Sequence, residues 1–248
     1  MSSEQFPDHI DRILKDWPYD GEALSVRRIE GPDGRDLLQI RIELGLLQLE
    51  TSDRPDGTTP GGHPSYLDFL KDESQHDDMY EFDENDFIEV DREFLQYYHR
   101  RICWLRLHEY EKAMTDADHS LALMDFCREH SEDEDWILSH EQYRPFVLFH
   151  RTQAAALAAL ESDGPENAIG EVNLGLDRLK DFFREFSSDD LFEEDELVAQ
   201  LVEVRESLRE TFDVGLTLEE QLVQAVAQEQ YERAALLRDK LAKRDPLH

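Results

Sequence analysis

The stretch from Thr217 to Lys243 most constrains how this chain can fold, because two short amphipathic segments flank a polar break. Thr217 stands before an apolar segment and Glu220 follows three residues later, which is the spacing of a capping box at the start of a helix. The polar residues 228–230 interrupt the apolar pattern, and it resumes at Tyr231. Two short stripes joined by a short turn predict an antiparallel helical hairpin over residues 217–243.

Both segments carry apolar or small residues at helical spacing, so each should bury one face. The stripe of the first helix comprises Leu218, Leu222, Ala225 and Val226. The stripe of the second comprises Tyr231, Ala234, Ala235, Arg238 and Leu241, with Leu237 beside it. We expect the two stripes to face each other.

These residues resemble the UVR motif, a short hairpin found in the excision-repair proteins UvrB and UvrC and in bacterial stress proteins of Clp-type protease systems. The resemblance rests on the first stripe, on Tyr231-Glu232-Arg233-Ala234-Ala235, and on Leu237-Arg238-Asp239 followed by Leu241. It implies a module that docks on another protein, in the setting of excision repair or of a Clp-type protease. It covers residues 217–243 only, so it identifies a module and not the whole chain.

The resemblance also implies which residues bind the partner. They are Leu218, Leu222, Val226, Tyr231, Ala234, Ala235, Leu237, Arg238 and Leu241. A hairpin this small cannot bury its apolar residues alone, which favours pairing with another UVR-type hairpin or with its own copy.

The overall charge restricts the partners of the chain. Among 248 residues, 59 are acidic and 26 are basic, which gives a formal net charge of −33. Such a charge repels phosphate, so we expect no direct binding to nucleic acid. No apolar segment approaches the roughly 20 residues that cross a bilayer, and residues 1–9 lack the pattern of a signal peptide. The chain is therefore expected to be cytoplasmic and to make no membrane contact.

Residues 1–64 are expected to form a small region that contains β structure. A short helix is predicted first, because Ile10, Ile13, Leu14 and Trp17 share one helical face. Alternating segments at residues 24–28 and 38–44 then flank a turn signal at residues 31–34, which predicts an antiparallel hairpin with one buried face. Beyond Gly45 the alternation resumes one residue out of phase, as a bulge or bend would produce.

Residues 65–212 are expected to form a helical body. A short helix at residues 65–71 should lead into a solvated acidic connection at residues 72–93. The following pattern resembles part of a tetratricopeptide unit, in Leu107, Tyr110, Ala113, Met114, Ala117, Ser120 and Leu121. A second copy is suggested by Tyr98-His99-Arg100 recurring as Phe149-His150-Arg151, and by Ala168, Ile169, Val172, Gly175 and Leu176. A nonrepeating helical bundle is the alternative.

A further helix at residues 196–212 should close the body, because Leu197, Leu201, Val204 and Leu208 form one stripe. Gly215 is expected to end this helix and to act as a hinge before the terminal hairpin.

The sequence carries little sign of catalysis. A Gly-rich phosphate loop ending in Lys-Ser or Lys-Thr is missing, so the helicase activity of UvrB is not implied. Cys103 and Cys127 form no Cys-x-x-Cys pair and should be small buried apolar groups. The ten histidines show no second ligand pair at metal-binding spacing. We therefore expect no catalytic residue, no metal site and no cofactor.

Together these patterns predict a mainly α fold with a small N-terminal antiparallel β element, tetratricopeptide-like helical hairpins and a C-terminal UVR helical hairpin. The predicted regions are residues 1–64, 65–212 and 213–248. The preferred function is a noncatalytic adaptor for protein-protein interaction. The alternative is a metal-dependent enzyme with the hairpin as a regulatory tail.

Overall fold

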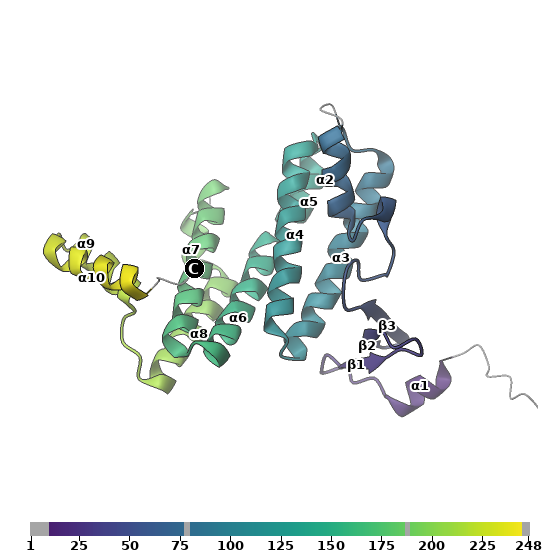
Figure 1. Cartoon of the computed structure of the whole chain (residues 1–248), viewed down its shortest axis with the longest axis horizontal. Helices are drawn as coiled ribbons and strands as arrows, with labels where there is room; N and C mark the ends of the chain where they lie inside the picture. The colour runs from purple at the N-terminus through teal and green to yellow at the C-terminus, as the bar shows by residue number, and fades with distance from the viewer. Residues whose placement is uncertain (1–9, 77–79, 187–188, 245–248) are drawn as a thin grey trace, which may run out of the picture. The chain divides into compact units, whose positions relative to one another are not determined.

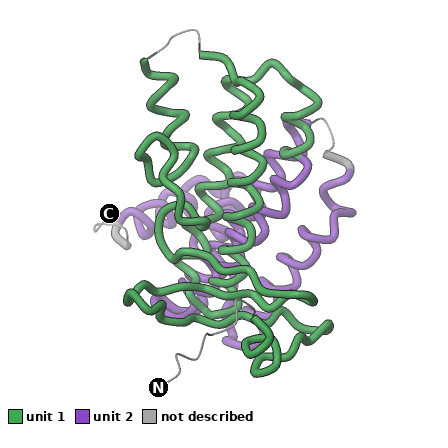
Figure 2. The backbone as a smooth tube through the Cα atoms, turned by 90° about the vertical axis from the view of Figure 1, so that its right-hand side faces the viewer, with its two compact units in different colours: residues 1–141 green, residues 142–248 purple. Residues whose placement is uncertain are grey.

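The computed structural model describes residues 10–76, 80–186 and 189–244. Residues 1–9, to which the signal-peptide argument applies, lie outside this part. The chain divides into two compact units, residues 1–141 and residues 142–248 (Figure 2). This division differs from the three predicted regions, because the β element packs on a long helix of unit 1 and the terminal hairpin belongs to unit 2.

The described residues of unit 1 form a short helix and a small sheet, then a short 3-10 helix and four α-helices (Figure 1). Its elements are α1 (Asp11–Asp16), β1 (Val26–Glu30), β2 (Asp36–Ile42), β3 (Gly45–Glu50), η1 (Pro60–Gly62), α2 (Tyr66–His76), α3 (Glu84–Arg106), α4 (Tyr110–His130) and α5 (Glu134–Glu141). Unit 2 is helical in all its described elements. They are α6 (Arg144–Ser162), α7 (Pro165–Glu185), η2 (Asp189–Glu194), α8 (Glu196–Phe212), α9 (Leu218–Ala227) and α10 (Tyr231–Arg244).

The sheet has the antiparallel order β1-β2-β3, so the predicted hairpin is confirmed and gains a third strand. The bulge or bend predicted at Gly45 is instead a two-residue turn that ends there. Ile42 pairs with Gly45 across a two-residue turn, and Leu44 in that turn is 87% exposed. The phase shift in the sequence therefore marks a reversal of the chain direction, because residues on either side of the turn belong to different strands.

The middle of β2 is buried on both faces, although the alternating sequence predicted one buried face. Leu38 and Ile40 are apolar, but Gln39 and Arg41 are buried too. The Arg41 guanidinium donates to the carbonyl oxygens of Trp17 (2.8 Å) and Gly45 (2.7 Å). Polar side chains are tolerated here because backbone acceptors of the neighbouring segments satisfy them.

The body contains two antiparallel helix pairs, α3 with α4 and α6 with α7, where the tetratricopeptide-like hairpins were predicted. Each pair reverses direction at a residue with left-handed backbone, His108 (φ 61°) in the first and Gly164 (φ 93°) in the second. Gly175 has no Cβ atom at the point where α7 crosses Thr152 of α6, so the two helices can approach closely. Cys103 and Cys127 are buried, as predicted.

Much of the predicted acidic connection at residues 72–93 is helical and partly buried. Helix α2 continues to His76, and α3 begins at Glu84 after a capping box formed by Asp83 and Asp86. The Asp86 carboxylate is buried, and it accepts hydrogen bonds from the hydroxyls of Tyr66 (2.6 Å) and Tyr80 (2.8 Å). The prediction of a solvated connection failed because some of these carboxylates do not face water. They cap α3 or accept hydrogen bonds from tyrosine hydroxyls.

Helix α8 spans the predicted residues 196–212, but the structure corrects how it ends. The left-handed residue at its C-terminus is Asp213 (φ 53°), and the Val214 amide then donates to the carbonyl oxygen of Arg209 (3.1 Å). Gly215 has no positive φ. Asp is one of the few side chains that adopt this conformation readily, so it terminates the helix two residues before the predicted position.

Candidate functional site

The terminal hairpin begins with the predicted capping box. The Thr217 hydroxyl accepts a hydrogen bond from the Glu220 amide (3.2 Å), and the Thr217 amide donates to the Glu220 carboxylate (2.7 Å). Two amides that lack a partner inside the helix are thereby satisfied. The polar turn after α9 follows, and the Gln230 amide donates to the carbonyl oxygen of Ala225 (2.8 Å).

The two helices meet through a small apolar cluster, which we call the hairpin core. It consists of buried Ala225, Ala234 and Leu237 with partly buried Leu218 and Leu222. The alanines bring the two backbones close together, and Leu237 fills the space between them. The hairpin core uses the first predicted stripe almost unchanged.

The stripe predicted for the second helix is wrong in part. Leu237 is central in the hairpin core and only 5% exposed, whereas the prediction placed it beside the stripe. Tyr231 is 68% exposed, and Ala235 and Arg238 are exposed as well. Helix α10 carries apolar or small residues on two adjacent faces, and the sequence pattern did not show which of them meets α9.

A second set of residues forms an exposed side of the hairpin, which we call the hairpin flank. Each of these residues directly follows a hairpin core residue in the sequence, except Tyr231, which lies one helical turn before Ala235. In two right-handed helices that run antiparallel, these positions fall on the same side of the pair. The hairpin flank consists of Glu219, Val223, Val226, Tyr231, Ala235 and Arg238.

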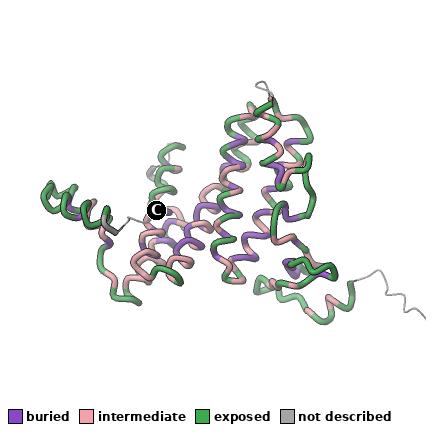
Figure 3. Tube along the Cα trace, in the orientation of Figure 1, coloured by how far each residue is buried: buried purple, intermediate pink, exposed green. Residues whose placement is uncertain are grey.

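Most residues of α9 and α10 are exposed (Figure 3). Apart from Glu219 and Arg238, the residues of the hairpin flank are apolar, and all of them are exposed. Val223 is 68% exposed and Val226 is 52% exposed. The opposite side of the pair comprises Gln221, Gln224, Arg233, Leu236 and Lys240, which are mostly polar. An isolated exposed valine would need no explanation, but exposed apolar side chains gathered on one side of a small element indicate a contact surface.

The terminal hairpin is similar to a known protein family. Residues 217–243 match the family model described as UvrB/uvrC motif. The terminal hairpin is a UVR motif. No curated protein and no solved structure matches the chain. UVR motifs mediate protein-protein interactions, so the family match and the exposed hairpin flank point to the same kind of site.

Some of the predicted partner-binding residues lie in or near the hairpin core, and the others lie on the hairpin flank. Ala234 and Leu237 are buried in the hairpin core, and Leu218, Leu222 and Leu241 are partly buried. Val226, Tyr231, Ala235 and Arg238 lie on the hairpin flank. Their binding role stays a prediction. The sequence interpretation missed Val223, although its position directly after Leu222 is the signal that places it on the flank.

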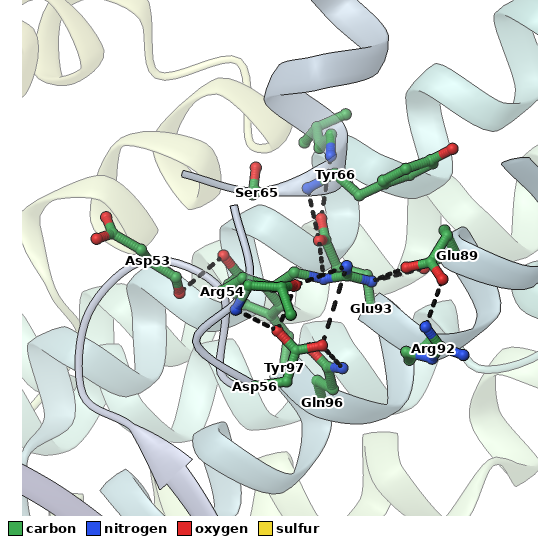
Figure 4. A network of polar contacts seen from close by, with 12 residues as sticks. Asp53, Arg54, Asp56, Ser65, Tyr66, Glu89, Arg92, Glu93, Gln96 and Tyr97 are labelled. Atoms are coloured by element: carbon green, nitrogen blue, oxygen red, sulfur yellow. Dashed lines mark hydrogen bonds and ion pairs between the residues drawn. The ribbon is translucent and has the colours of Figure 1, made fainter. Parts of the chain in front are cut away.

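Unit 1 contains a buried polar network centred on Glu93 and Arg54 (Figure 4). The Glu93 side chain is 0% exposed, and its carboxylate accepts hydrogen bonds from the amides of Tyr66 (2.6 Å) and Leu67 (3.0 Å). Arg54 Nε lies 3.1 Å from the same carboxylate, and His119 Nε2 lies 2.9 Å from it. Both carboxylate oxygens are thus committed to holding the start of α2 and the loop before it. The network stabilises the scaffold.

The described residues also bear on a metal site, a reactive cysteine and a membrane-spanning helix. Within the described ranges, no three His, Cys, Asp or Glu side chains gather where they would hold a metal ion. Burial raises the pKa of the Cys103 thiol to about 12, so this sulfur stays protonated near neutral pH. Among the described residues, no helix is both long and apolar enough to span a bilayer.

Proposed function

We propose that this protein is a noncatalytic adaptor that docks on a partner protein through the flank of its UVR hairpin. The observation that carries the proposal is the position of the exposed apolar side chains. Val223, Val226 and Tyr231 lie on one side of the hairpin, while the hairpin core is formed by other residues. Docking on the flank would leave the hairpin folded as it is.

The partner is another UVR-type hairpin, either in a different protein or in a second copy of this chain. A hairpin flank that is largely apolar favours a partner with a similar surface, since both would lose apolar contact with water. The cellular processes suggested by the UVR motif are excision repair and Clp-type proteolysis. The charge of −33 supports contact with proteins over contact with phosphate-rich nucleic acid.

The proposal is tested by affinity capture from the native cell with the full chain and two variants. In Val226→Asp/Tyr231→Asp, two charges stand on the hairpin flank, and we expect the bound partner to be lost because burying an unpaired carboxylate is costly. Leu236→Asp is the matched control, since Leu236 is 66% exposed on the opposite side.

Circular dichroism of both variants checks that the helices persist. Capture of the same UVR-bearing protein, or of a second copy, by wild type and Leu236→Asp alone supports the proposal. Equal capture by the flank variant would overturn it.

A further inference from the structure

The connection between the UVR hairpin and the rest of unit 2 is short and has little apolar packing. Helices α9 and α10 pack mainly on each other, and neither packs extensively on α6, α7 or α8. Residues 213–216 join α8 to the hairpin, and most of them are exposed. A Cβ atom added at Gly215 would contact nothing within 4 Å. Apolar burial therefore does not explain how the hairpin is held.

Polar contacts converge instead on a single side chain, Glu220. One carboxylate oxygen, Oε1, accepts hydrogen bonds from the Arg209 guanidinium of α8 and from the Asn173 amide of α7 (3.0 Å). The other oxygen, Oε2, accepts from the Thr217 backbone amide (2.7 Å). The carboxylate that caps α9 thus also joins α9 to both neighbouring helices.

Arg209 adds a second tie to the same connection. Its other terminal nitrogen donates to the carbonyl oxygen of Gly215 (2.6 Å), so one guanidinium binds both the connecting segment and the first turn of α9. Asn173 is oriented in turn by Arg205, which donates to the Asn173 side-chain oxygen (3.2 Å). The arrangement is a network whose members fix each other's orientation.

The network is shielded from water and favours the charged carboxylate. The side chains of Arg209 and Glu220 are 14% and 21% exposed. Burial alone raises the pKa of Glu220, but the hydrogen bonds from Arg209, the Thr217 amide and Asn173 outweigh it and lower that pKa below its usual value. A charge-assisted pair of this kind is stronger than a solvent-exposed ion pair.

We propose that Glu220 and Arg209 form a latch that fixes the orientation of the UVR hairpin on α7 and α8. When the latch is broken, the hairpin moves about the segment 213–216 while its own helices stay folded. The latch determines the direction in which the hairpin flank faces. This inference concerns how the hairpin is held, and it stands whether or not the flank binds a partner.

Substitutions separate the latch from the helix cap. Arg209→Met removes the cationic partner and leaves Thr217 and Glu220 free to form the capping box. Glu220→Gln keeps a side chain that serves at this position of a capping box but removes its charge. Glu219→Gln is the matched control, because it removes the same charge from the exposed neighbouring residue in the same helical turn.

The test is ¹⁵N relaxation of the full chain, which compares backbone amides of α9 and α10 with those of α6–α8. In wild type and Glu219→Gln, we expect one common rotational correlation time for both groups. In Arg209→Met, the hairpin amides should show a value shorter by about twofold, as for a small element moving on the nanosecond timescale. Glu220→Gln should change in the same direction by a smaller amount.

Independent tumbling of the hairpin in wild type would overturn the proposal, and so would a common correlation time in Arg209→Met. Circular dichroism establishes that the helices persist. If Arg209→Met loses helix content, Asn173→Ala and Glu220→Gln decide the question, and rigid hairpins in both would contradict the latch.

Discussion

At the scale of single residues, Gly175 sets the spacing of α6 and α7. A Cβ atom at this position would overlap the Oγ1 and Cγ2 atoms of Thr152, whose side chain is buried. Gly175→Ala should lower the free energy of unfolding by about 1–3 kcal/mol, because a packed helix crossing has no room for the methyl group. Urea unfolding followed by circular dichroism measures this change.

The same helix provides the control for this prediction. A Cβ atom at Gly170 would have nothing within 4 Å. Gly170→Ala should therefore leave stability unchanged or raise it by up to about 1 kcal/mol, because alanine is the better helix former. Equal effects of the two substitutions would show that Gly175 does not determine the helix spacing.

Glu93 is the residue on which the buried network of unit 1 depends. Glu93→Gln leaves Arg54 buried without its full counter-charge and weakens the anchoring of α2. Arg54 keeps its ion pair with Glu89 (2.6 Å), so we expect a loss of about 1–3 kcal/mol, from weaker hydrogen bonds to the Tyr66 and Leu67 amides. We expect a lower urea midpoint in the tryptophan fluorescence, because Trp17, Trp104 and Trp136 all lie in unit 1. An unchanged midpoint would contradict the network, and the exposed Glu84→Gln serves as the control.

At the scale of elements, the UVR hairpin offers two adjacent leucines with opposite environments. Leu237 is 5% exposed in the hairpin core, and Leu236 is 66% exposed. Leu237→Ala should cost about 2–5 kcal/mol, which is large for so small an element. We expect hydrogen exchange of the amides of α9 and α10 to accelerate strongly. Leu236→Ala should leave that exchange unchanged, and similar acceleration in both variants would count against the described core.

Elements whose signals are local could be predicted from the sequence. The capping residues Thr217 and Glu220 predicted the start of α9, and the apolar stripe at residues 197–208 predicted α8. Both sequence patterns are local, since the residues of each are a few helical turns apart at most. The turn at Leu44 and the left-handed Asp213 were missed, since backbone direction and φ are set by the contacts of the folded chain.

The candidate site could be predicted as a region but not as a surface. The sequence placed Val226 and Leu237 in one list, although only the arrangement of α9 against α10 decides that one is exposed and the other buried. The contact between Glu93 and the start of α2 joins residues 26 and 27 positions apart. Helical or strand periodicity in the sequence does not predict a contact between residues this far apart.

At the scale of the whole molecule, the charge of −33 opposes the folded state, because folding brings acidic residues closer together. Salt shortens the screening length from about 10 Å at 0.1 M to about 3 Å at 1 M. Thermal unfolding followed by circular dichroism should therefore show a higher midpoint as sodium chloride is raised over this range. A midpoint that falls would mean that favourable ion pairs outweigh the repulsion.

Docking through the hairpin flank is tested most directly by site-specific photocrosslinking in the native cell. A photoreactive phenylalanine analogue replaces either Tyr231 on the flank or Leu236 on the opposite side, both of which are exposed. We predict an adduct at position 231 with a UVR-bearing protein or a second copy of this chain, and no such adduct at position 236. The same adduct at both positions, or at position 236 alone, would contradict docking through the flank.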